Sequence, residues 1–187
     1  MITFNFAPFP ILTFDRLLFR RLTDEDAQEV LELRSNAKTM KFIPRPVIST
    51  IKEALLHIKL INDNIDTNTD INWAVTEKGL DKCIGIMGFF NTKPENHRTE
   101  LGYMILPEYH NLGYVTEAVV ALLNFAFKEI NLHSVQAIID PENLASERVL
   151  QKNGFVKEAH FVENVFYKGK FVDKVIYSLL DRNFKNL

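Results

Sequence analysis

The segment between residues 99 and 140 constrains the fold of this chain more than any other part. Thr99–Leu106 alternates like a strand and is stopped by Pro107. Apolar residues at helical spacing then predict a helix over Gly113–Ile130, and His133–Asp140 predicts a second strand. A strand, a helix and a strand in this order predict a right-handed crossover between two parallel strands.

The rest of the chain predicts elements that flank this unit. Alternation and turn residues predict five more strands, over Thr13–Leu22, Asn72–Thr76, Cys83–Phe90, Phe161–Tyr167 and Phe171–Leu180. Helical spacing and capping residues predict three more helices, over Asp24–Asn36, over about 50–65 from a start at Ser49 or Thr50, and over Asn143–Asn153. Asn62–Asp70 has the composition of a loop. We therefore expect an α/β or α+β fold, in which helices cover a mixed sheet.

Composition limits both the number of domains and the class of partner. A chain of 187 residues with 47% hydrophobic content suits one domain over 1–187, with its core at about 12–180. A formal charge of -2 argues against a nucleic-acid binder, and no apolar run is long enough to span a membrane. Cys83 has no partner for a disulfide, and Met1–Phe14 lacks the basic start of a signal peptide. The expected location is the cytoplasm.

One motif has the character of an anion-binding site. The stretch from Glu100 to Glu117 passes from a strand through a short turn into a helix that begins near Gly113. The N–H groups of a first helical turn lack partners within the helix and attract anions, and glycine allows a close approach of the ligand. The motif is neither a GxGxxG turn nor a Walker loop. It predicts a cradle for a pyrophosphate.

The same stretch resembles motif A of the GNAT acetyltransferases, whose phosphate loop has the form Q/R-x-x-G-x-G/A. His110, Gly113 and Val115 occupy its three marked positions, although His110 replaces Gln or Arg and Val115 replaces a small residue. Gly113–Ala118 and Thr13–Leu22 are similar to the RimJ/RimL-like branch of that family.

A second match lies nearer the C-terminus. Asn143-x-x-Ser146 followed by Leu150–Phe155 resembles the "NxxS…LxKxGF" ending of that branch. The three matches occur in family order, and the resemblance runs from about Leu12 to Leu180.

The resemblance implies a fold, an activity and a set of binding residues. The fold would be a twisted, mostly antiparallel sheet with a central parallel pair and helices on both faces. The activity would be transfer of an acetyl group from acetyl-CoA to a primary amine, by direct attack on the thioester and without a metal. The five histidines show no metal-ligand spacing. The residues expected to bind the cofactor are Met104, Ile105, Leu106, His110, Asn111, Leu112, Gly113, Tyr114, Val115, Thr116, Asn143 and Ser146.

Glu100 and Ser146 are the candidate catalytic residues. Alternation places Glu100 on one face of its strand with Gly102 and Met104. A carboxylate there could take a proton from the acceptor through water, which is general-base catalysis. The alternative is a structural ion pair to Arg98 or Arg148. The resemblance places Ser146 near the cofactor sulfur, as a contact or as an acid, because Leu150 stands where many GNAT enzymes have Tyr. The alternative role of this motif is helix capping by Asn143.

The acceptor remains open between a peptide or ribosomal-protein N-terminus and a small amine such as a polyamine. The helices at 24–36 and 50–65 should shape its site, with Phe42, Phe89 or Tyr167 as lining. Two other functions compete: an acyl-CoA-binding module without catalysis, and a structural or partner-binding α/β domain. The sequence leaves monomer and homodimer equally open.

Overall fold

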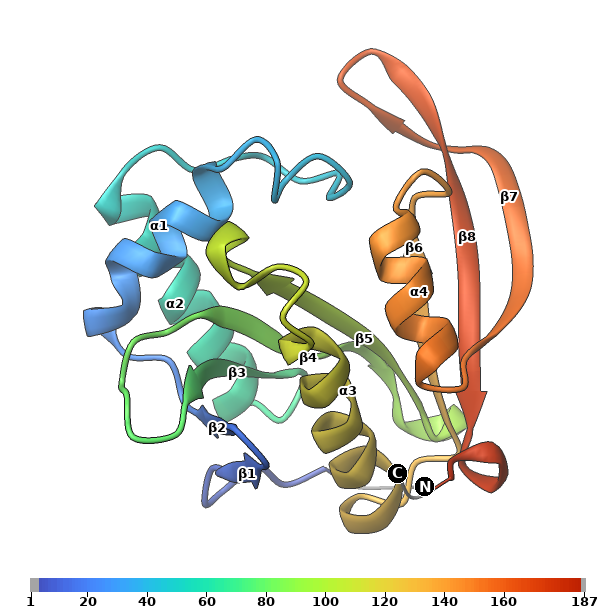
Figure 1. Cartoon of the computed structure of the whole chain (residues 1–187), viewed down its shortest axis with the longest axis horizontal. Helices are drawn as coiled ribbons and strands as arrows, with labels where there is room; N and C mark the ends of the chain where they lie inside the picture. Colours follow the sequence, from blue (N-terminus) through green and yellow to red (C-terminus); the bar gives the residue numbers. More distant parts are fainter. Residues whose placement is uncertain (1–3, 186–187) are drawn as a thin grey trace.

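A computed structural model describes residues 4–185, so Met1–Thr3 of the apolar start and the last two residues lie outside the described part. Within residues 4–185, eight strands form one sheet in the order β1-β2-β3-β4-β5-β6-β8-β7 (Figure 1). Their bounds are β1 Leu12–Phe14, β2 Leu17–Arg20, β3 Ile71–Glu77, β4 Gly85–Lys93, β5 Arg98–Ile105, β6 Ser134–Ile139, β7 Val156–Tyr167 and β8 Lys170–Leu180.

The pairing of the strands confirms the predicted topology. Strands β1 to β5 form an antiparallel meander, and β6, β8 and β7 pair antiparallel beyond it. The two groups meet only where β5 runs parallel to β6, over the three residue pairs from Arg98–Ser134 to Glu100–Gln136. The crossover predicted over residues 99–140 is therefore the junction of the sheet.

Four α-helices cover both faces of this sheet, as predicted. Their bounds are α1 Ala27–Ser35, α2 Ile51–Asp66, α3 Tyr114–Asn124 and α4 Leu144–Lys152. Helix α1 follows a single 3₁₀ turn at Asp24–Asp26, and α3 continues as a π-helical turn over Phe125–Glu129. Helices α1 and α2 pack against each other, as do α3 and α4. The space between the two pairs is filled by the apolar side chains of the central strands.

The strand predicted over Thr13–Leu22 is wrong in one respect, because the chain reverses within it. Asp15 has a positive φ of 29°, and the turn at Asp15 and Arg16 separates β1 from β2, which pair with each other. Alternation alone cannot reveal the reversal, since both strands keep the same period of two. Leu17 and Phe19, two alternate residues of β2, are fully buried, as the alternation of this segment predicts.

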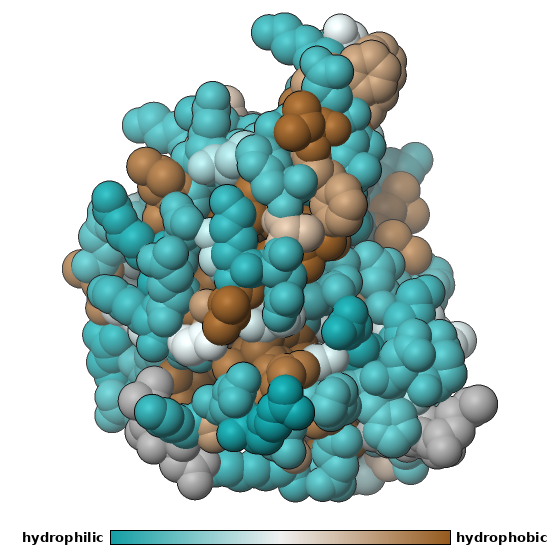
Figure 2. Space-filling view, turned by 90° about the vertical axis from the view of Figure 1, so that its right-hand side faces the viewer, coloured by the Kyte–Doolittle hydropathy of each residue, from teal (hydrophilic) through white to brown (hydrophobic). Residues whose placement is uncertain are grey.

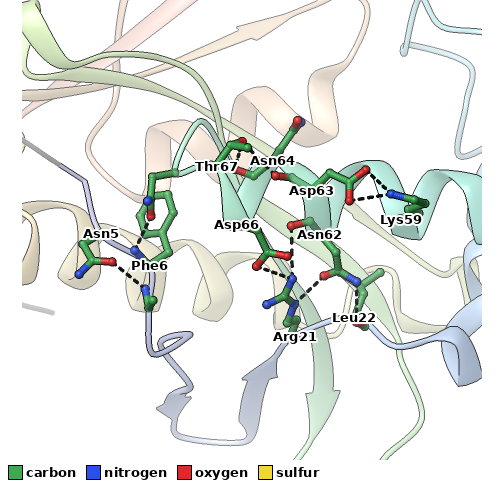
Figure 3. Close-up of polar contacts among 12 residues, drawn as sticks. Asn5, Phe6, Arg21, Leu22, Lys59, Asn62, Asp63, Asn64, Asp66 and Thr67 are labelled. Atoms are coloured by element: carbon green, nitrogen blue, oxygen red, sulfur yellow. Dashed lines mark hydrogen bonds and ion pairs between the residues drawn. The ribbon is translucent and has the colours of Figure 1, made fainter.

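The loop predicted over Asn62–Asp70 is also partly wrong, since α2 continues to Asp66. Ile65 is buried one turn after Ile61, so apolar packing holds the last turn despite its polar composition. Arg21 donates from Nε to Asn62 (2.9 Å) and from a terminal nitrogen to Asp66 (2.8 Å), as Figure 3 shows. These contacts attach the end of α2 to the segment that follows β2.

Strand β7 forms an edge of the sheet and carries exposed apolar side chains. Phe161, Val162 and Phe166 of β7, with Phe171 of β8, are all exposed. Figure 2, seen from this side, shows apolar side chains gathered toward the hairpin that protrudes at the top. None of the helices in the described residues has the length and apolar character that a membrane span requires.

Candidate active site

Strand β5 leaves part of its backbone without a partner strand. The N–H of Leu106 donates to Ile84 (2.9 Å), and antiparallel pairing alternates, so Met104 also faces β4 while Tyr103 and Ile105 face away. Pairing with β6 ends at Glu100, after which the two strands diverge (Figure 1). The backbone groups of Tyr103 and Ile105 therefore line a wedge between the two halves of the sheet, where an extended amide could pair with them.

The N-terminus of α3 lies at the end of β5 and has no side-chain cap. Helices α2 and α4 differ in this respect, because Thr50 and Asn143 accept hydrogen bonds from their first turns. The first helical bond of α3 runs from Glu117 N–H to the carbonyl of Gly113, which leaves the preceding N–H groups free to bind an anion. Gly113 has a φ of +84°, a conformation that residues with a Cβ rarely adopt.

Arg16 lies in the β1–β2 turn, nearly a hundred residues earlier in the chain, and its side chain binds the turn that precedes α3. Its Nε bonds Glu117 at 2.8 Å, and both terminal nitrogens lie 3.3 Å from the carbonyl oxygen of Leu112. The guanidinium also lies 4.3 Å from the ring centroid of Tyr114, whose hydroxyl donates to Glu77. Sequence spacing gave no sign of these contacts, although Arg16 lies inside the N-terminal family match.

The predicted cofactor residues before the helix fall into distinct positions. Met104 lines a cavity, whereas Ile105 and Leu106 bury their side chains in the core. The Leu106 N–H is occupied by Ile84, so of these three residues only Ile105 can offer a backbone group to the wedge, namely its N–H. Nε2 of His110 donates to the carbonyl oxygen of Ile105 (3.1 Å), which requires the tautomer protonated at that nitrogen.

The remaining predicted residues form the turn and the first turn of α3. Asn111 has a positive φ of 61°, and Asn111, Leu112 and Gly113 are exposed. Val115 and Thr116 are half-buried, and Val115 packs against the core. The bulk of Val115 is therefore accommodated by the protein interior rather than by the exposed turn.

Glu100 lies on β5 beside the wedge and is only 8% exposed. Asn91 donates from Nδ2 to its carboxylate (3.1 Å), and neither Arg98 nor Arg148 forms an ion pair with it. Arg98 instead donates to Ser134 (2.9 Å), so the structural ion pair considered above is absent among residues 4–185. Burial raises the pKa of Glu100 above its usual range, and the hydrogen bond from Asn91 partly offsets this.

Ser146 approaches from the opposite side of the wedge, at the start of α4. Asn143 accepts a hydrogen bond from the Ser146 N–H (3.1 Å), which confirms the helix-capping role. The hydroxyl of Tyr103 lies 3.5 Å from the carbonyl oxygen of Ser146, and burial raises the pKa of Tyr103 to about 12. Leu150 is fully buried. The side chain of Tyr103 thus brings a second hydroxyl close to Ser146. Alternation along β5 places this side chain on the face opposite Glu100.

A cavity of about 530 Å³ joins these groups to the helices at the N-terminal end of the chain. It extends from Ser146 and Met104 past Glu100 to α1 and α2, so both helices that the sequence suggested for the acceptor site line this cavity. Phe42 and Tyr167 line it, whereas Phe89 is buried in the core.

Several charged or titratable residues of the cavity were not identified from the sequence, among them Arg34, Arg45, His57 and Asp70. They come from separate elements, and no motif connects them. No three His, Cys, Asp or Glu side chains within the described ranges converge as metal ligands.

Comparison with known proteins identifies the family. Residues 16–156 match the acetyltransferase (GNAT) domain. The uncharacterised N-acetyltransferase YnaD of Bacillus subtilis is 34% identical, over 91% of this chain and 96% of its own length. A GNAT-family acetyltransferase from Bacillus anthracis has a TM-score of 0.82 at 30% identity, covering 92% of this chain and 99% of its own.

A ribosomal L7/L12 acetyltransferase, RimL in complex with coenzyme A, shares the fold. Its TM-score is 0.83 at 16% identity, and the match covers 91% of this chain and 98% of that one. The RimL-like resemblance is thus a structural one, while the domain match and the sequence relatives are all acetyltransferases. On these grounds the chain belongs to the GNAT acetyltransferase family and is an N-acetyltransferase.

Proposed function

We propose that this protein transfers the acetyl group of acetyl-CoA to a primary amine. The carrying observation is the junction of an uncapped helix N-terminus at Gly113 with the stretch of β5 at Tyr103 and Ile105 whose outer side has no partner strand. The helix N-terminus suits a pyrophosphate, and the strand backbone suits an amide-containing arm. The two features lie at the two ends of one short segment. The complex of the RimL structure with coenzyme A is consistent with this assignment.

The residues that would hold the donor follow from this geometry. The N–H groups between Asn111 and Thr116 would bind the pyrophosphate, with the side chain of Arg16 beside them. The outward backbone groups of Tyr103 and the N–H of Ile105 would bind the pantetheine amides, which directs the thioester toward Glu100 and Ser146.

The proposed reaction is direct attack of the amine on the thioester. Glu100, directly or through a water, takes the proton that the ammonium must lose, and its raised pKa suits this role near neutral pH. The amine nitrogen then bonds to the acetyl carbon, and the bond between that carbon and sulfur breaks. The nitrogen then loses its second proton, which reaches the leaving thiolate through the hydroxyl of Ser146 or of Tyr103, so that neither hydroxyl is left deprotonated. The products are an N-acetylated amine and coenzyme A.

The competing interpretation as a non-catalytic acyl-CoA-binding module lacks a supporting observation. It requires no buried carboxylate in the cavity, whereas Glu100 is retained there without an ionic partner among the described residues. We further propose that 1–187 forms a single domain, since one sheet extends from Leu12 to Leu180, and that its location is the cytoplasm, in line with the free thiol of Cys83.

Thermal unfolding with acetyl-CoA, and then with CoA alone, tests the proposed donor. A ligand that binds only the folded state adds about 2.7 kcal/mol of stability at 100 times its dissociation constant, so both should raise the melting temperature. Release of the CoA thiol in the presence of amines then tests transfer. A folded protein whose melting temperature neither ligand changes would contradict the proposal.

A further inference from the structure

Arg34 is a buried cation in the cavity wall without an acidic partner. Its side chain, at the end of α1, belongs to a residue that is 9% exposed, and the cavity reaches it. One terminal nitrogen donates to the carbonyl of Pro46 at a long 3.4 Å, and Nε has no hydrogen-bond partner among residues 4–185. Burial and the neighbouring Arg45 lower the pKa of Arg34, but a guanidinium stays charged at physiological pH.

The surroundings of Arg34 add positive charge rather than neutralise it. Arg45 is close enough to act on Arg34, and His57 lies beside both. Burial, followed by the two arginines, lowers the pKa of His57 to about 4, so this imidazole is neutral at pH 7. A buried charge without a counter-ion is unfavourable unless something compensates it. The described residues supply no anion at this wall, which leaves that role to a ligand.

Another part of the same cavity carries the carboxylates of Asp70 and Glu100. Asp70 has a buried carboxylate oxygen, Oδ1, without a hydrogen-bond partner among the described residues. Burial raises the pKa of Asp70, and the backbone N–H groups of Thr92 and Asn91 partly offset this rise. The side chain of Asn91 binds Glu100, so Asp70 and Glu100 flank one residue, with Lys174 also acting electrostatically on Glu100. Arg45 acts electrostatically on both carboxylates, and the carboxylates and the two arginines line one cavity.

We propose that the acceptor is a zwitterion, an amine that also carries a carboxylate. This inference rests on the proposed function and specifies its substrate class. The Arg34 guanidinium binds the carboxylate through paired N–H donors, with Arg45 beside it. Asp70 and Glu100 hold the ammonium, from which Glu100 then takes the proton. A polyamine offers no anion to Arg34 and adds cations beside Arg45, so it fits this cavity poorly.

Matched acceptors test the inference directly. The carboxylate could belong to a free α-amino acid or to an acidic residue next to a peptide N-terminus. Thiol release from acetyl-CoA is measured with α-amino acids and their α-amides, with the peptide amides of Ser-Glu and Ser-Gln, and with spermidine. We expect kcat/KM at least about tenfold higher for the carboxylate member of one pair, which also identifies the source. Equal rates within both pairs, or faster turnover of spermidine, would overturn the inference.

Two variants separate anion binding from a structural role of Arg34. Arg34→Met removes the charge, and Arg34→Lys keeps it without the planar fork. In both, KM for the preferred carboxylate acceptor should rise about tenfold or more, and less in Arg34→Lys. KM for the matched amide and the thermal shift with acetyl-CoA should not change. If Arg34 only anchors the loop at Pro46, both acceptors will lose affinity equally, and the inference fails.

A binding measurement keeps this inference distinct from the proposed function. Thermal unfolding with the same amino acids and amides, in the presence of CoA, detects binding without turnover. Stabilisation by the carboxylate member alone, without thiol release, would support the zwitterion site while contradicting acetyl transfer. Turnover without preference for a carboxylate would support acetyl transfer while contradicting the zwitterion site.

Discussion

Burial changes the chemistry of two side chains in opposite ways. It raises the pKa of Glu100, which makes this carboxylate a stronger base, and it raises the pKa of the Cys83 thiol to about 12, which keeps that group protonated. Glu100 lines the cavity, whereas Cys83 is 1% exposed and donates to the carbonyl of Gly85 (3.3 Å). The same physical effect thus favours reactivity at one residue and prevents it at the other.

Replacement of Glu100 by Gln should lower thiol release from acetyl-CoA by about 10²- to 10⁴-fold, the usual contribution of a general base. The thermal shift with acetyl-CoA should stay the same, because the donor binds through backbone groups. Glu95→Gln, at an exposed carboxylate outside the cavity, is the matched control and should keep full activity. Normal activity of Glu100→Gln would exclude Glu100 as the base.

The same substitution should also change stability in a pH-dependent way. The folded pKa of Glu100 lies above its unfolded value, so its contribution to stability is present below the unfolded pKa, about 4.3, and is lost as pH rises through the folded pKa. Glu100→Gln should therefore unfold at a higher temperature than the parent protein at pH 7. The difference should shrink as pH falls toward 4, and a constant difference across this range would contradict the pKa shift.

Cys83 should not react with thiol reagents in the folded protein. Its thiol is buried and has almost no thiolate at neutral pH, which is the reactive form. Labelling with a chromogenic disulfide should be complete in denaturant and very slow without it. Fast labelling of the folded protein would show that the β4 region opens, and would add a background to thiol-release assays.

At the scale of elements, the turn before α3 combines backbone strain with ligand binding. Gly113→Ala places a Cβ in a left-handed conformation, at an expected cost of about 1–2 kcal/mol in unfolding free energy. Gly169→Ala in the β7–β8 turn is a matched control, because its φ of +79° imposes the same strain and no other atom lies within 4 Å of the new Cβ.

Both variants should lose similar stability, measured by denaturant unfolding. Only Gly113→Ala should also bind acetyl-CoA more weakly, since the added methyl group lies at the proposed pyrophosphate cradle and 3.5 Å from Arg16. Equal affinity of the two variants for acetyl-CoA would place the donor elsewhere.

At the scale of the whole molecule, the two parts of the sheet join over only three parallel residue pairs. A ligand in the wedge would bridge the β1–β5 meander and the β6–β8–β7 group. Amide hydrogen exchange should therefore slow on addition of acetyl-CoA at Tyr103 and Ile105. The amide of Met104, on the β4 side of the same strand, should change little, and protection confined to residues outside the wedge would contradict this binding mode.

Much of the fold followed from local chemistry. The alternation of Leu17 and Phe19, the start of α2 at Ser49 or Thr50 and the start of a helix near Gly113 depend on neighbours a few residues away, so spacing predicted them correctly. Errors arose where a distant contact decided the outcome. The turn at Asp15 depends on pairing of β2 with β3, and the last turn of α2 depends on burial of Ile65.

The candidate site divides in the same way. The strand, the turn at Gly113 and the helix that follows were predictable from the sequence, because one short segment contains them all. The separation of β5 from β6 after Glu100, and the position of Arg34 and Asp70 in the same cavity as Glu100, became evident in the folded chain alone. Strand pairing and the burial of a charge depend on residues remote in the chain, so no local pattern records them.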